Sequence, residues 1–183
     1  PKTRNGSVPI AGSFGKEEMS AEHMIHGGGD CRQGNWRSET VLALLLIFLT
    51  LAVYGQAVGF GFLHFDDNVY VTDNAQVRSG LTGSPLRWAF STLEAGFWHP
   101  LTWISLMMDA QLYGSWAGGF HLTNVLLHGW ATLLLFFTLS RITGSPRRSA
   151  FVAGMFAIHP LHAESVAWIA ERKDVLSGFL WMA

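Results

Sequence analysis

The stretch TVLALLLIFLTLAVYGQAVGFGFL, Thr40 to Leu63, decides the fold class, because it is apolar almost throughout and carries no charged side chain. An α-helix rises about 1.5 Å per residue, so this segment spans roughly 36 Å, more than the roughly 30 Å hydrocarbon core of a bilayer. A cleaved signal sequence has a shorter apolar region and seldom follows a long polar tail. We therefore predict a first transmembrane helix at about 40–63.

The composition of the whole chain also indicates a membrane protein. Of its 183 residues, 49% are hydrophobic and 14% are charged, whereas a soluble domain carries roughly 25% charged residues. A net charge of −1 provides no basic face for nucleic acid. The single cysteine rules out a disulfide framework within the chain. Because the sequence starts at a proline and stops inside an apolar run, we expect an N-terminal piece of a longer protein.

Further apolar segments predict three more spans. The second covers about 119–140, the third covers about 149–170, and a fourth opens at about 175–183 and is truncated. The third span contains His159 and Pro160, and a proline inside a helix removes a hydrogen bond. We therefore expect the third span to be broken at this point.

The remaining segments are polar or mixed. Residues 1–39 are Gly-rich without a helical or strand period, which predicts a disordered tail. Residues 64–118 form a long connection with helical patterns that begin near Ser84 and Pro100. Its four tryptophans suit a membrane–water interface. The predicted fold is an all-α, polytopic membrane bundle with a long outer loop that carries short interfacial helices.

The positions of the arginines predict the orientation of the spans. The loop between the second and third spans holds three arginines and no acid, and Arg32 and Arg37 lie shortly before the first span. The positive-inside rule places both on the cytoplasmic side. The N-terminus is then cytoplasmic, and the loop 64–118 lies outside. We expect the bacterial inner membrane as the location, with the endoplasmic reticulum membrane as the alternative.

An acidic pair, Asp66 and Asp67, follows the first span directly in HFDDNVYVTDN. Repulsion between neighbouring carboxylates and partial burial both raise a carboxyl pKa, which suits a general base. Capping of a helix end is an equally weighted interpretation. The segment lacks the Asp-x-Asp-x-Asp-Gly spacing of a calcium loop.

A second charged cluster, ERKD, combines Glu171, Arg172, Lys173 and Asp174 at the border of the third span. Arg172 and Lys173 are candidates for holding an anionic phosphate, since arginine gives a forked contact and lysine a point charge. On a helix, Glu171 and Asp174 share one face and are candidates for supporting such a site. The alternative is a solvated helix end with local ion pairs.

Four more side chains are candidates for supporting a site on the same side. His159, His162 and Glu164 precede the ERKD cluster, and His99 comes from an earlier His-Pro-Leu sequence. A His-x-x-His pair is an incomplete metal motif. We therefore expect no cofactor and no metal site, with a divalent metal as an open alternative.

Four stretches carry a resemblance to a known family. In chain order they are FDDNVYVTDN, WHPLTWISLMMDAQLYG, FHLTNVLLH and HPLHAESVAWIAERKDVLSG. They resemble the membrane half of the transmembrane and tetratricopeptide-repeat-containing protein O-mannosyltransferases and their bacterial relatives, which are GT-C fold glycosyltransferases. The resemblance runs from Thr40 to the end. It implies a GT-C-like bundle followed by tetratricopeptide repeats, a dolichyl or polyprenyl phosphate sugar donor, and a protein Ser or Thr hydroxyl as acceptor.

The resemblance also implies roles for the charged residues. The acidic pair of the first outer loop is the family's catalytic element, so Asp66 is expected to be the base and Asp67 to assist or orient it. One displacement at the anomeric carbon inverts the sugar, and Arg172 and Lys173 are expected to stabilise the leaving lipid phosphate.

Two other functions stay open. One is a non-catalytic membrane scaffold attached to a downstream tetratricopeptide repeat domain. The other is a transporter, in which His121, Asn124 and His128 on one face of the second span line a path.

Overall fold

The structure, a computed structural model, describes residues 31–183, with side chains described from Trp36 onward. Every regular element in this range is a helix, which confirms the predicted all-α class. Residues 1–30, most of the predicted disordered tail, lie outside the described residues. Residues 40–183 form one compact unit.

Among the described residues, two helices are long and apolar enough to cross a membrane. They are α2 (Cys31–Tyr54), which a short 3-10 turn extends to Gly59, and α6 (Ala117–Thr143). Helix α2 begins before the predicted start at Thr40, so the end of the predicted disordered tail is helical. That segment has no proline, and its Arg, Gln and Glu residues favour helix. With only helices in the described range, the chain is an all-α membrane helical protein.

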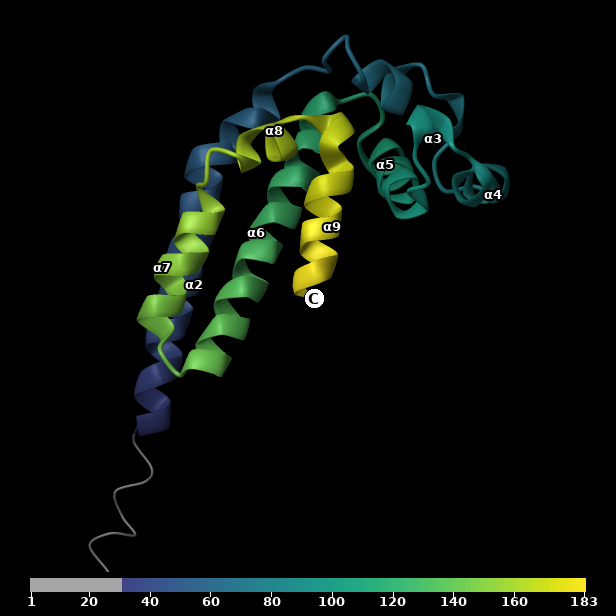
Figure 1. The fold of residues 1–183 in the computed structure, drawn as a ribbon. Coiled ribbons are helices and arrows are strands. Elements are labelled where there is room, and N and C mark those ends of the chain that lie inside the picture. The colour runs from purple at the N-terminus through teal and green to yellow at the C-terminus, as the bar shows by residue number, and fades with distance from the viewer. Residues whose placement is uncertain (1–30) are drawn as a thin grey trace, which may run out of the picture. The chain divides into compact units, whose positions relative to one another are not determined.

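Helix α6 is the centre of the bundle and packs against α7 (Pro146–Ala157) and α9 (Arg172–Met182) (Figure 1). Leu46 of α2 joins Phe136 and Ala153 in a shared apolar core. Large apolar side chains also face outward, and Phe48 and Phe151 are each 70% exposed. Such surfaces are rare in water and suit contact with lipid or with further helices.

The predicted third span is divided, as expected from its proline. Helix α7 ends at Ala157, and the short helix α8 (His162–Ala167) follows the break that contains His159 and Pro160. Helix α7 rises only about 18 Å, less than a bilayer core. A 3-10 turn (Ile169–Glu171) then leads into α9, which starts at Arg172 and so earlier than predicted.

The long connection folds into short helices at one end of the bundle. These are α3 (Ala75–Arg78), α4 (Gly83–Ser91) and α5 (Pro100–Tyr113). Trp103 of α5 is fully buried in the core that they share with α6. Figure 1 shows that α8 and the start of α9 lie at this end, whereas the α6–α7 connection lies at the other. We call the first of these the loop end.

Candidate functional site

The two neighbouring aspartates at the loop end differ in their surroundings. Asp67 is fully buried, and its carboxylate accepts hydrogen bonds from the backbone N–H groups of Leu63 (2.8 Å) and Ala170 (3.0 Å). Burial raises the pKa of Asp67, and these two N–H groups and nearby His121 oppose the rise. Asp66 is half-buried, and its carboxylate makes no hydrogen bond within the described part of the chain. Asp67 therefore fixes the loop, while Asp66 keeps its oxygens available.

A stack of aromatic rings joins the acidic loop to α5. Tyr70 lies in the π-helical turn Asn68–Thr72, and its ring centroid is 5.0 Å from that of Trp103. His99 stacks on both rings, at 5.8 Å from Tyr70 and 5.0 Å from Trp103. Burial raises the pKa of Tyr70, and the charges of Lys173, Glu171 and Asp66 also act on it.

His99 has unusual surroundings for a polar side chain. Both ring nitrogens are buried and have no hydrogen-bond partner among the described residues. Burial lowers the pKa of His99, and the positive charge of Lys173 lowers it further. The ring therefore stays neutral at pH values where an ordinary histidine begins to gain a proton. A neutral imidazole has one donor and one acceptor nitrogen, and both lack a partner among the described residues.

Lys173 borders a groove of about 740 Å³ between α9 and the segment before α5. Its Nζ lies 2.8 Å from Glu171 Oε2, and both side chains are partly exposed. Partial burial lowers the pKa of Lys173, but Glu171, Tyr70 and Asp174 together outweigh it, so the pKa is raised and the lysine stays charged.

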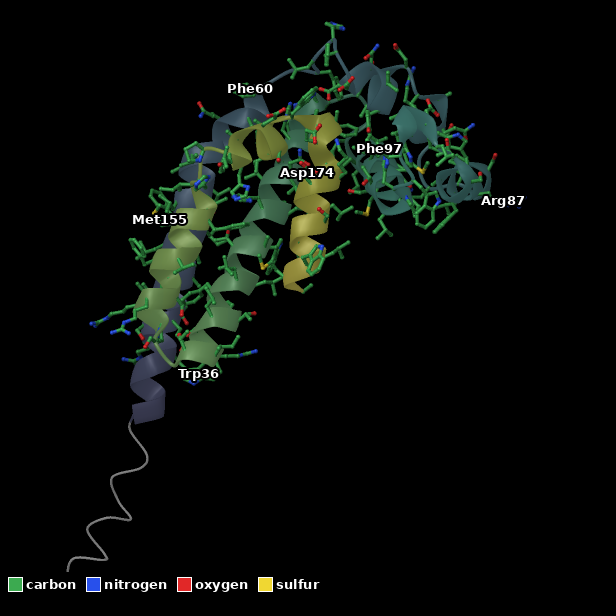
Figure 2. All side chains as sticks on the ribbon, viewed as in Figure 1. Trp36, Phe60, Arg87, Phe97, Met155 and Asp174 are labelled. Atoms are coloured by element: carbon green, nitrogen blue, oxygen red, sulfur yellow. The ribbon has the colours of Figure 1, made fainter. Side chains whose placement is uncertain are left out.

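The groove is mostly apolar. Phe97 and Asp174, which are labelled in Figure 2, border it from different elements. Its large apolar side chains come from α4, the segment before α5, α5 itself and α9: Phe90, Phe97, Trp98, Leu101, Leu176 and Leu180. The charged side chains on its border are Lys173 and Asp174, both from α9.

Arg172 points into the protein and not toward this groove. It is fully buried, and its Nη2 lies 2.6 Å from Asp109 Oδ2 of α5. Nη2 also donates to the Phe120 carbonyl (2.8 Å), Nη1 donates to Ser105 Oγ (2.7 Å), and Nε donates to Asn124 Oδ1. Of the two cations expected to hold a phosphate, the structure therefore places only Lys173 at the groove.

The candidates on and before α8 lie apart from His99 and Lys173. His162 packs against Phe156 and His128, with ring centroids 4.6 Å and 5.3 Å away. His159 is exposed and its Nδ1 accepts a hydrogen bond from the Leu161 backbone. Exposed Glu164 borders a different hollow, beside the segment 59–63. The sequence predicts that all of these residues lie on the same side of the membrane. The structure does not bring them into one cluster with His99 and Lys173.

The three polar residues of α6 that could line a transport path are buried, and each forms a hydrogen bond to another segment. His121, Asn124 and His128 face main-chain carbonyls of other elements. Their partners are Gly61 (3.5 Å), Trp168 (3.0 Å) and Ala157 (3.0 Å), respectively. Each of these bonds therefore ties α6 to another segment of the chain, as buried polar groups usually do.

Sequence reasoning did not single out Asp109, Ser105 or Tyr70, and it grouped Trp103 with the interfacial tryptophans, whereas Trp103 is fully buried. Asp109 had a signal, since it is the one charged residue in the otherwise apolar helix α5, and such an acid usually has a buried partner. Tyr70 had none, because its position depends on the turn that follows the acidic pair.

Metal-binding side chains do not converge in the described part of the chain. No three His, Cys, Asp or Glu side chains there are placed to hold an ion. A mechanism without a metal stays a prediction.

Comparison with known proteins now bears on the identity of the chain. Protein O-mannosyl-transferase TMTC1 of Homo sapiens is 33% identical over 174 residues, which cover 85% of this chain and 19% of the relative. Protein O-mannosyl-transferase Tmtc2 of Drosophila melanogaster is 32% identical over 138 residues, covering 69% of this chain and 14% of the relative. Protein O-mannosyl-transferase TMTC4 of Mus musculus is 27% identical over 163 residues, covering 76% and 22%.

This chain belongs to the TMTC family of protein O-mannosyl-transferases. It spans about a fifth of the length of the human relative. No protein-family model matches the chain, and no solved structure does.

In this TMTC family member, three kinds of chemistry meet at the loop end. Asp66 provides a carboxylate, Lys173 provides a fixed positive charge, and the adjoining groove provides apolar surface. A carboxylate can take a proton from a nucleophile, and a cation can stabilise an anionic leaving group.

Proposed function

We propose that this chain is part of a protein glycosyltransferase that moves a sugar, mannose, from a polyprenyl or dolichyl phosphate to a protein Ser or Thr hydroxyl on the outer or lumenal face. The observation that carries the proposal is the hydrogen bond from the Ala170 N–H to Asp67, which holds the acidic pair against the turn that leads to Lys173 and its apolar groove. The names of the relatives support mannose as the sugar and protein as the acceptor.

The groove supports a lipid-linked donor. Its aromatic and aliphatic lining, including Leu176 and Leu180 of α9, suits the first isoprene units of the lipid. The phosphate would then lie near Lys173 on the border of the groove.

The transfer step uses the two charged groups at opposite ends of the reaction. The acceptor hydroxyl oxygen forms a bond to the anomeric carbon, and its proton passes to Asp66. The bond between the anomeric carbon and the phosphate oxygen breaks, and the lipid phosphate leaves with the electron pair. Lys173 stabilises the charge that develops on that phosphate. A single displacement inverts the configuration of the sugar.

Asp67 has an orienting role in this proposal. Its two backbone hydrogen bonds hold the loop against the turn before α9. The partly exposed Asp66 is then held next to the site by its buried neighbour.

The proposal is tested with Asp66→Asn in the complete protein, by measuring mannose transfer from polyprenyl phosphate mannose to an acceptor peptide. Loss of a general base is expected to lower kcat by about 10²- to 10⁴-fold with normal expression. Asp73→Asn is the matched control, because Asp73 is an exposed acid of the same loop. Unchanged transfer by Asp66→Asn would refute the assignment of the base.

The same proposal places the protein in the bacterial inner membrane or the endoplasmic reticulum membrane. Its N-terminus then lies on the cytoplasmic side. Arg147 and Arg148 follow the α6–α7 connection, at the end opposite the loop end (Figure 1). The positive-inside rule then sets the candidate site on the outer face. Cysteines introduced at Ser145 and Gly83 test this: an impermeant reagent is expected to label only Gly83→Cys in intact cells or vesicles of known orientation.

A further inference from the structure

We propose that Asn124, locked in place by Arg172, is a positioning residue for the acidic loop and acts through Asp67. The inference rests on the proposed function, because it assigns a role at that same site. Neither the apolar face of α6 nor the family resemblance predicts it. It follows from the hydrogen bonds of one short turn.

The Asn124 carboxamide connects the two ends of the turn between α8 and α9. Its Nδ2 donates to the Trp168 carbonyl (3.0 Å), and its Oδ1 accepts from Arg172 Nε. Asn124 is fully buried, so water does not compete for either bond. One side chain of α6 therefore fixes where the turn begins and where it ends.

The middle of this turn holds the acidic loop. The Ala170 N–H donates to Asp67 Oδ1 (3.0 Å), while Asp67 Oδ2 accepts from Leu63 (2.8 Å). Because Asp67 is buried, its carboxylate depends on these two donors, and an unmet bond at a buried charge is costly. A displaced Ala170 N–H would shift Asp67 and with it the adjoining Asp66.

Arg172 makes the orientation of Asn124 unambiguous. Arginine carries only donors, so the Asn124 oxygen must face Arg172 and the amide nitrogen must face Trp168. Arg172 is in turn held by Asp109, Ser105 and the Phe120 carbonyl. The chain of contacts runs from α5 through Arg172 and Asn124 to the turn, and from Ala170 to Asp67.

A bland alternative is that Asn124 only holds helices together. The two roles differ in one respect. If Asn124 acts through Asp67, its effect on the chemical step shrinks once the Asp67 carboxylate is already altered. If it only stabilises the fold, the two effects multiply.

The test is a double-mutant cycle between Asn124→Asp and Asp67→Asn in the complete protein, with polyprenyl phosphate mannose as donor. Asn124→Asp keeps an acceptor for Arg172, replaces the donor to Trp168 by an acceptor and adds a carboxylate beside the Arg172 guanidinium, so the contact with Arg172 is retained. We expect Asn124→Asp to lower kcat by about tenfold or more, with the donor KM changed less than about twofold. The double variant is expected to be at least about threefold faster than the product of the single effects.

A matched control is Thr132→Val. Thr132 is buried on the same helix, and its Oγ1 donates to a carbonyl of that helix, His128 (2.9 Å). We expect it to leave kcat unchanged, alone and in combination with Asp67→Asn. Arg172→Lys, which removes the Nε donor but keeps a charge near Asp109, is expected to follow Asn124→Asp in lowering kcat at constant donor KM.

The outcomes separate this inference from the proposed function. Effects that multiply, an unchanged kcat in Asn124→Asp, or a raised donor KM as its main effect would each overturn the positioning role. If Asp66→Asn abolishes transfer at the same time, the proposed function stands without it. If Asp66→Asn retains full transfer, the proposed function loses its base whatever the cycle shows.

Discussion

Two pairs of like charges meet at the loop end, Asp66 with Asp67 and Arg172 with Lys173. In each pair one member is fully buried and hydrogen-bonded, and its neighbour, Asp66 or Lys173, is partly exposed. Consecutive residues point in different directions, so neighbours in sequence do not act as one charged unit. In both pairs the buried member holds the local fold and leaves the other for the site.

The two buried members differ in the partners that hold them. Asp67 is held by backbone N–H groups, which survive a change of side chain elsewhere. Arg172 is held mainly by side chains, and one of them, Asp109, is itself a buried charge. Removal of Arg172 therefore leaves Asp109 as a buried charge without its partner. Removal of the Asp67 charge leaves no such charge.

The largest effect on stability is expected for Arg172→Ala. Breaking a buried ion pair from one side costs about 3 to 5 kcal/mol of the free energy of unfolding. Denaturant unfolding in detergent, or the yield of folded protein, measures it. The double variant Arg172→Met with Asp109→Leu is expected to recover most of the loss, because no buried charge then lacks a partner. A mild effect of Arg172→Ala would show that the buried and exposed cations are equivalent.

The sequence predicted part of this arrangement, and the pairs show where prediction ended. The apolar runs indicated the helical class and both long helices, and charges at the ends of apolar runs drew attention to Asp66 and Arg172. Which member of each pair is buried depends on distant residues. Ser105 and Asp109, the partners of Arg172, lie 67 and 63 residues away. Local spacing does not contain that information.

The division of the third span shows a similar limit. A proline after His159 predicted the break, and the break is present. The hydropathy of the segment suggested a crossing on its own, but α7 is too short for one. Apolar content alone does not tell a spanning helix from a helix that packs beside one.

A smaller loss is expected for Asp67→Asn. The change removes the charge and turns one hydrogen-bond acceptor into a donor that faces a backbone N–H. Loss of a hydrogen bond to a buried charged group costs about 1.5 to 3 kcal/mol. Asp66→Asn is the matched comparison, and its half-buried side chain is expected to change the free energy of unfolding by less than about 0.5 kcal/mol. Equal losses in unfolding experiments would remove the distinction between the two aspartates.

Lys173→Gln is expected to have almost no effect on stability and a clear effect on the donor. Its ion pair with Glu171 is partly exposed, and such pairs contribute about 0 to 1 kcal/mol. If Lys173 binds the donor phosphate, initial-rate kinetics at varied donor concentration should show a donor KM raised by about tenfold, which corresponds to one charge-assisted contact. Lys173→Arg, which keeps the charge, serves as the control. An unchanged donor KM in Lys173→Gln would show that Lys173 does not bind the donor phosphate.

The smallest effect concerns His99, which stacks on Tyr70 and Trp103 and borders the same groove as Lys173. Its folded-state pKa is lowered from the ordinary 6.5 by burial and by Lys173. The unfolded chain therefore binds a proton more readily as the pH falls below 6.5, so the His99 contribution to stability is present above that pH and is lost toward the folded-state pKa. His99→Gln has no such proton, and its Tm should fall less between pH 7.5 and 5.5 than that of the unsubstituted protein. If the Tm of His99→Gln falls more steeply than that of the unsubstituted protein, the His99 ring is charged in the folded protein. That result would contradict the lowered pKa of His99.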